Sequence, residues 1–159
     1  MRARLCIAVV ALMASSIGCA KWVSAQQLGS LDQLIGRDIE PSYPLVRCAA
    51  FYLANIEWAG QALDEDVFEE SKTLMGDLLL ASVLVRSKRA GAESEGLEHL
   101  AQTANADTRQ IADLYLENYR RNYAATGTAW QGNTVWESDA VTCRELAENV
   151  LFSNAEIGE

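Results

Sequence analysis

Residues 65–88 read EDVFEESKTLMGDLLLASVLVRSK, and this stretch decides the fold class. Apolar side chains recur in it at three- and four-residue steps, which is the spacing of one face of an α-helix. Acidic residues fill its first turns and basic residues its last turns, just before Gly91, so both ends suit the helix dipole and a helix stop. Because residues 78–85 are apolar on nearly all sides, we expect this helix to lie at the centre of the fold.

Three further segments have apolar residues at the same helical spacing: residues 44–63, 95–125 and 139–151. Pro44 suits the first turn of the first segment, and Ser138 is placed to cap the last one. Arg47 falls outside the apolar face of its helix. No alternating strand pattern is present, so the sequence predicts an all-α bundle of four main helices.

The first 25 residues have the three-part pattern of a cleaved export signal. Arg2 and Arg4 precede an uncharged apolar run that is too short for a comfortable membrane helix, and small residues lie just before Gln26. An uncleaved anchor is one alternative, and a lipoprotein attached through Cys19 is another. We expect cleavage after residue 25, which gives a periplasmic or secreted protein with no membrane span.

The expected mature chain has three parts: an irregular lead-in over residues 26–41, a single helical domain over 42–153 and a tail over 154–159. A short turn is expected within the lead-in, near residues 30–34. Signal removal takes away three of the 13 basic side chains and none of the 22 acidic ones, which leaves 10 basic and 22 acidic side chains and a net charge of −12. Nucleic acids and anionic membranes bind basic surfaces, so this charge argues against both as partners.

Cys48 and Cys143 are the two cysteines that remain after signal removal. An even number of cysteines in an exported chain favours a disulfide, because oxidising compartments form and keep such bonds. Two buried free thiols or an intermolecular bond are the alternatives. We expect an internal Cys48–Cys143 disulfide.

This disulfide constrains how the helices are connected. Both cysteines lie in the early turns of their expected helices, and a disulfide requires Cα atoms within about 7 Å. In an up-down-up-down bundle those early turns lie at opposite ends, about 30 Å apart. The sequence therefore predicts a long loop over residues 126–138 that crosses back along the bundle. A break of the third helix within Asn105-Ala106-Asp107 is the alternative.

Tyrosines and tryptophans near the end of the third helix form the candidate binding residues: Tyr115, Tyr119, Tyr123, Trp130 and Trp136. The tyrosines are four residues apart and so share one face of a helix, while the tryptophans lie in the expected loop. Such side chains are enriched in contact surfaces, which predicts a binding surface for a partner. The alternative is a core edge on which the loop packs, with the polar tips reaching water.

Catalytic and cofactor-binding motifs are scarce in the chain. His99 is the only histidine, so we expect neither a zinc site nor a histidine-dependent nucleophile. No phosphate loop, haem motif or calcium loop is present, and we expect no metal and no cofactor. Glu137-Ser138 resembles the Glu-Ser pair of lytic transglycosylases, but the chain has no other motif of that family.

These features favour a non-catalytic binding protein of the inhibitor, immunity or chaperone-like kind, whose partner is another protein of the cell envelope. Two alternatives remain. An envelope enzyme that cleaves glycans would use Glu137 as one of its carboxylates. A helical sensor would instead hold a small ligand between its helices.

Overall fold

The structure is a computed structural model, and it describes residues 28–91 and 94–157. Its elements are α1 (Tyr43–Ala59), the 3-10 helix η1 (Gly60–Ala62), α2 (Glu65–Ala90), α3 (Ser94–Thr126) and α4 (Thr134–Ile157). The predicted all-α bundle of four main helices is confirmed, and the described residues contain no strand. None of the described helices combines the length and apolar character that a membrane span requires. The expected signal peptide, residues 1–25, lies outside the described residues.

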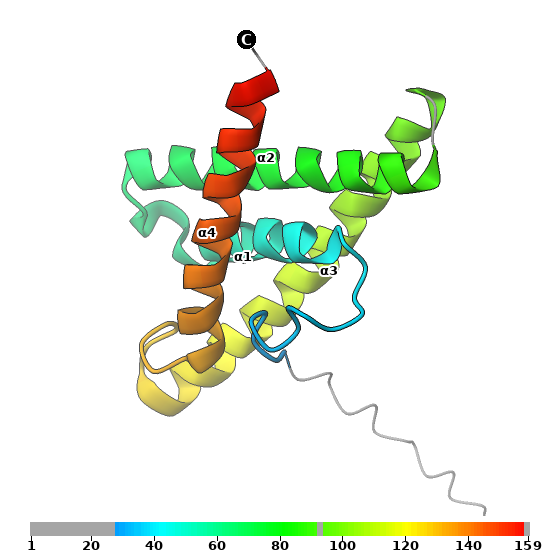
Figure 1. Ribbon diagram of the computed structural model, residues 1–159. Coiled ribbons are helices and arrows are strands. Elements are labelled where there is room, and N and C mark those ends of the chain that lie inside the picture. The colour runs from blue at the N-terminus through cyan, green and yellow to red at the C-terminus, as the bar shows by residue number, and fades with distance from the viewer. Residues whose placement is uncertain (1–27, 92–93, 158–159) are drawn as a thin grey trace, which may run out of the picture.

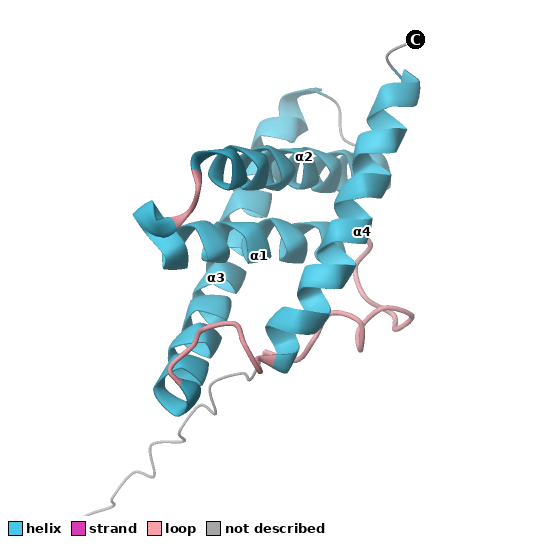
Figure 2. Ribbon diagram, turned by 90° about the vertical axis from the view of Figure 1, so that its left-hand side faces the viewer, coloured by secondary structure: helices cyan, strands magenta, loops and turns pink. Residues whose placement is uncertain are grey.

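The four helices are arranged in three layers. The middle layer consists of α1 and α2, which lie side by side (Figure 1). Helix α4 crosses one face of this pair at a steep angle, and α3 crosses the opposite face (Figure 2). The core consequently lies around α1, which packs against each of the other three long helices.

Helix α1 is the most buried element, although the sequence predicted a central position for the helix at residues 65–88. Buried side chains of α1 include Leu45, Cys48 and Phe51, whereas α2 buries only Leu78 and Ser82. Three buried residues of α1 are alanines, whose short side chains let neighbouring helices approach its backbone closely: Ala49, Ala50 and Ala54. The opposite side of α2 faces solvent. The prediction that its apolar residues 78–85 place this helix at the centre of the fold is therefore wrong.

Glycines end the two helices of the middle layer. Helix α1 ends at Ala59, earlier than the predicted residue 63, because Gly60 has a φ of 54° and leads the chain into η1. Helix α2 ends before Gly91, whose φ of 59° is left-handed and whose N–H donates to the Ser87 carbonyl. A left-handed glycine after the last helical residue is a common helix stop.

Helix α3 is continuous from Ser94 to Thr126, so the alternative of a break near Asp107 is wrong. The same face of α3 points inward before and after this region, because Ala104, Thr108 and Ala112, which are four residues apart, are all buried. Asn105 remains within the helix and its side-chain amide donates to the Ala101 carbonyl, one turn earlier.

Helix α4 begins at Thr134, five residues before the predicted start at residue 139. Its cap is Asn133, whose Oδ1 accepts a hydrogen bond from the Trp136 N–H at 3.3 Å. The prediction that Ser138 is the cap is wrong, since Ser138 lies inside the helix and its hydroxyl donates to Asp32. The loop between α3 and α4 therefore covers residues 127–133 rather than 126–138, and α4 extends to Ile157, into the expected tail.

The Cys48–Cys143 disulfide is present, with the two Cα atoms 5.1 Å apart and both side chains fully buried. Cys143 lies well inside α4, and its bond to Cys48 joins this helix to α1, which α4 crosses (Figure 1). Helices that cross at a steep angle meet at one point, so the short loop at residues 127–133 is sufficient for the bond. The bond therefore forms without a long loop that runs back along the bundle.

Residues 28–42, called the lead-in segment below, form turns and lead up to the start of α1 beside α4, where Asp32 accepts a hydrogen bond from Ser138 (Figure 2). The expected turn is present, since the Leu31 carbonyl accepts hydrogen bonds from the N–H groups of Leu34 and Ile35. Leu28 and Leu31 are buried in the core. These two side chains hold the segment against the bundle.

Reduction of the Cys48–Cys143 disulfide is expected to destabilise the fold strongly. The bond closes a loop of 95 residues, for which the chain-entropy account gives about 4–5 kcal/mol. Thermal unfolding followed by circular dichroism should show a melting temperature lower by roughly ten degrees or more in the presence of reductant. An unchanged melting temperature would contradict this role.

Candidate functional site

A buried ion pair between Arg47 of α1 and Asp139 of α4 lies at the centre of the described structure. The Arg47 Nη2 and Asp139 Oδ2 atoms are 2.6 Å apart, and the side chains are 2% and 0% exposed. Arg47 directly precedes Cys48, and Asp139 lies one helical turn before Cys143. The disulfide therefore brings the two charges to the same place.

Hydrogen bonds from two other segments complete this buried network. Tyr115 of α3 accepts a hydrogen bond from Arg47 Nε at 2.8 Å and donates its own hydroxyl proton to Asp139 Oδ2. In the lead-in segment, the Gly29 carbonyl accepts from Arg47 Nη2 at 2.5 Å, and the Leu31 N–H donates to Asp139 Oδ1 at 2.6 Å. One ion pair thus joins α1, α3, α4 and the lead-in segment.

Burial alone would lower the pKa of Arg47, but charge interactions with Tyr115 and Asp139, together with hydrogen bonds, raise that pKa above its ordinary value. The pKa of Tyr115 is raised well above its ordinary value, first by burial and then by the nearby Asp139 charge. At neutral pH the network therefore contains a guanidinium cation and a neutral phenol.

Sequence reasoning placed Arg47 outside the apolar face and read Asp139 only as the start of a helix. The residues do carry a signal, because Arg47 interrupts an apolar run beside one cysteine and Asp139 lies one turn before the other. A charge inside an apolar run needs a buried partner. The predicted disulfide supplies the position of that partner.

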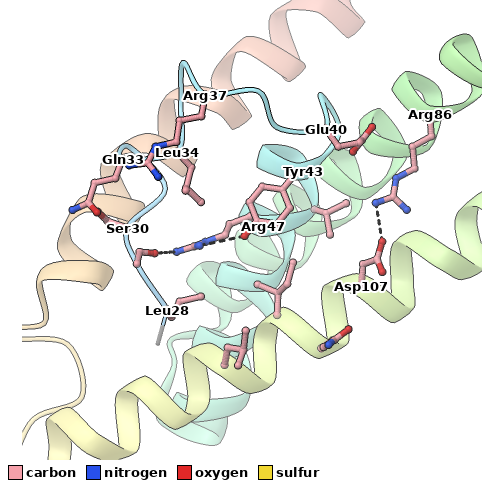
Figure 3. A pocket seen from close by; sticks show the side chains of 15 residues that line it. Leu28, Ser30, Gln33, Leu34, Arg37, Glu40, Tyr43, Arg47, Arg86 and Asp107 are labelled. Atoms are coloured by element: carbon pink, nitrogen blue, oxygen red, sulfur yellow. Dashed lines mark hydrogen bonds and ion pairs between the residues drawn. The ribbon is translucent and has the colours of Figure 1, made fainter. Parts of the chain in front are cut away.

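A cleft of about 620 Å³ opens beside the buried network, between the lead-in segment and the three helices α1, α2 and α3. Figure 3 shows the lead-in segment along one side, Tyr43 and Arg47 in the middle, and Arg86 with Asp107 at the far end. Apolar side chains contribute much of the lining: Leu28, Leu34, Val46, Ile111 and Leu114. A volume of this size is typical of small-molecule sites.

The arginines of the cleft differ in whether they form an ion pair with another residue. Arg86 donates to the Ser42 hydroxyl at 2.7 Å and to Asp107 at 2.8 Å, so that its charge is already paired. Arg47 is paired with Asp139. Arg37 lines the cleft, is exposed, and forms no ion pair with any of the described residues. It is therefore the cation that a ligand can reach without displacing an existing partner.

The five candidate aromatic residues are divided between the core and the surface. Tyr115 and Tyr119 are fully buried, Tyr123 is 56% exposed, and Trp130 and Trp136 are half-buried. The Tyr119 hydroxyl and the Trp136 indole N–H both donate to Asn55, at 2.9 and 3.0 Å.

Burial raises the pKa of Tyr119 above its ordinary value. The Trp130 and Trp136 rings stack with centroids 5.8 Å apart, which packs the loop at residues 127–133 against α4. Tyr115 and Tyr119 therefore belong to the core contacts, and Tyr123 presents the largest aromatic surface of the five to solvent.

Glu137, the residue of the glycan-cleaving alternative, is exposed near the start of α4 and does not line the cleft. Its carboxylate accepts a hydrogen bond from the Gly132 N–H at 3.0 Å, which helps to hold the loop before the helix. His99 is exposed on α3. Across the part of the chain that the structure describes, no group of three or more histidine, cysteine, aspartate or glutamate side chains is placed to hold a metal ion.

Comparisons with known families, with curated proteins and with solved structures found no match to this chain. Function is therefore inferred from the cleft and from the buried ion pair beside it.

Asp139→Asn is expected to lower the free energy of unfolding by about 3–5 kcal/mol, because it leaves the Arg47 guanidinium buried without a counter-charge. Urea denaturation followed by tryptophan fluorescence measures this loss. The double variant Arg47→Met/Asp139→Leu should recover much of it, since both charges are then replaced by apolar groups.

Asp113→Asn is the matched control, because Asp113 is 68% exposed and, among the described residues, pairs only with surface Arg109. Its expected cost is below about 1 kcal/mol. A loss for Asp139→Asn as small as that of the control would show that the buried pair does not organise the fold.

Proposed function

We propose that the protein is exported to the periplasm or secreted, and that it works there as a non-catalytic binding protein. The proposal of export rests on the signal-like residues 1–25 and agrees with the buried disulfide, since oxidising compartments keep such bonds. The ligand is a small anion with an apolar body, held in the cleft beside the lead-in segment. The protein is then a carrier or sensor of such molecules.

One observation carries this proposal: Arg37, which forms no ion pair with the described residues, lines a cleft that also contains several aliphatic side chains. A carboxylate or phosphate would pair with Arg37 by charge-assisted hydrogen bonds, while the apolar body would cover Leu34, Ile111 and Leu114. Arg47 keeps its own partners, and its charge is already balanced by Asp139. Glu40 also lines the cleft, but its carboxylate already accepts hydrogen bonds from the Ser42 N–H and hydroxyl, so Arg37 gives the cleft a preference for an anion although the whole chain is acidic.

The other hypotheses use different parts of the molecule. A protein partner of the cell envelope would contact exposed side chains such as Tyr123, which is 56% exposed. A glycan-cleaving enzyme would use Glu137, whose carboxylate is engaged with the Gly132 N–H. The cleft favours a small ligand over both, because it combines concave apolar surface with an arginine that forms no ion pair with the described residues.

Isothermal titration calorimetry with octanoate and with octylammonium tests the proposed ligand class on the mature chain. Octanoate should bind and octylammonium should bind more weakly, because only the carboxylate can pair with Arg37. Arg37→Glu should weaken octanoate binding by about tenfold or more, which is the size expected for the loss of one charge-assisted hydrogen bond.

Arg121→Glu is the matched control, since it makes the same change of charge at an exposed position of α3 that does not line the cleft. It should leave octanoate affinity nearly unchanged. Failure of octanoate to bind, or an equal loss in both variants, would contradict the proposal. Binding of a protein partner that survives Arg37→Glu but is lost in Tyr123→Ala would favour the partner hypothesis instead.

A further inference from the structure

A second cleft, separate from the one beside the lead-in segment, opens where α4 crosses α1 and α2 (Figure 1). Its volume is about 400 Å³, which is within the range of small-molecule sites. All three helices line it, and α4 alone contributes Trp136, Ala140 and Arg144 at four-residue steps along one face. The two clefts have no lining residue in common, so this one is a site of its own.

Aromatic side chains form one wall of the second cleft. The Phe51 ring centroid lies 5.6 Å from that of Tyr52 and 6.1 Å from that of Trp136, so the three rings make one contiguous surface. Val67 and Leu151 also line the cleft and are 44% and 43% exposed. An apolar group bound here would cover surface that the fold leaves in contact with water.

Charged side chains of both signs lie close to Tyr52 in the same cleft. Glu70 comes from α2, while Arg144 and Glu148 come from α4, one turn apart. Burial raises the pKa of Tyr52, the Arg144 charge opposes this rise, and the Glu70 and Glu148 charges add to it. Charges shift a pKa only when they lie near the titrating group, so all three are near the Tyr52 hydroxyl. All three are exposed, and none forms an ion pair with a described residue.

This set of charges fits a zwitterion better than an ion of one sign. An anion would pair with Arg144 but would meet two carboxylates, and a cation would pair with a carboxylate but would be repelled by Arg144. A ligand with adjacent carboxylate and ammonium groups can form charge-assisted hydrogen bonds with side chains of both signs. Arg144 and Glu148 lie one turn apart, which suits two opposite charges carried on one small group.

We propose that the second cleft binds a free α-amino acid with a large apolar side chain. The carboxylate of the ligand pairs with Arg144, and its ammonium group pairs with Glu148 and Glu70. Its side chain packs against the aromatic wall of the cleft. The protein then has two binding sites of different chemistry, since the cleft beside the lead-in segment takes an anion.

Isothermal titration calorimetry of the mature chain with phenylalanine tests this site. Phenylalanine should bind, and three related compounds should bind at least about tenfold more weakly, because each lacks one of the proposed contacts. N-acetylphenylalanine has no ammonium group, phenylalanine amide has no carboxylate, and glycine has no apolar side chain. Phenylalanine affinity should be unchanged in Arg37→Glu and in the presence of octanoate, so the two sites succeed or fail separately.

Charge-neutralising variants test the assigned contacts. Arg144→Gln and the double variant Glu70→Gln/Glu148→Gln should each weaken phenylalanine binding by about tenfold or more. Arg121→Gln and Glu145→Gln are the matched controls, because both residues are exposed and neither lines the second cleft. The controls should bind as the wild type does, and circular dichroism should show every variant folded.

Three results would overturn the proposal. The first is a mature chain that does not bind phenylalanine. The second is equal affinity for phenylalanine and for either of its blocked forms, because the site would then not read both charges. The third is a loss of affinity in the control variants, or in Arg37→Glu, as large as the loss in Arg144→Gln, because the ligand would then not be held by the second cleft.

Discussion

The buried ion pair between Arg47 and Asp139 is the interaction on which the rest of the structure depends. Two charges removed from water require each other and a full set of hydrogen bonds, and the chain supplies these from four separate segments. The disulfide fixes α1 against α4, and Tyr115 adds α3 to the same contact. The lead-in segment is bonded through its backbone, so its path along the bundle is set by this network.

The positions of the four helices and the pairing of the cysteines were predictable from the sequence, for different reasons. Helical periodicity is a local property, so the runs that became α2 and α3 can be recognised without their neighbours. The pairing followed from counting, because only two cysteines remain after signal removal. The start of α4 was not predictable in this way, since Asn133 and Ser138 are both good caps and the choice depends on how Trp136 packs.

The helical spacing of apolar residues does not identify most residues of the candidate site. Tyr115 and Tyr119 were assigned to a possible contact surface because tyrosines serve both surfaces and cores, and only the packing of α1 against α3 buries them. Arg47 was counted as a surface charge, because its partner lies 92 residues away in the chain. The cleft itself is lined from four segments, and no local pattern indicates that Arg37 and Arg47 both line it.

The proposed function rests on the same network, because Arg47, whose ion pair with Asp139 holds the lead-in segment, also lines the cleft. The most direct measurement is the position of a bound anion, obtained by adding octanoate to the 15N-labelled mature chain and following amide shifts in two-dimensional NMR. The account predicts shifts concentrated in residues 28–40 and 43–47 and in the adjoining part of α3, at residues 107–114. Shifts centred on the far side of α1, around Tyr52 and Trp136, or no shifts at all, would contradict it.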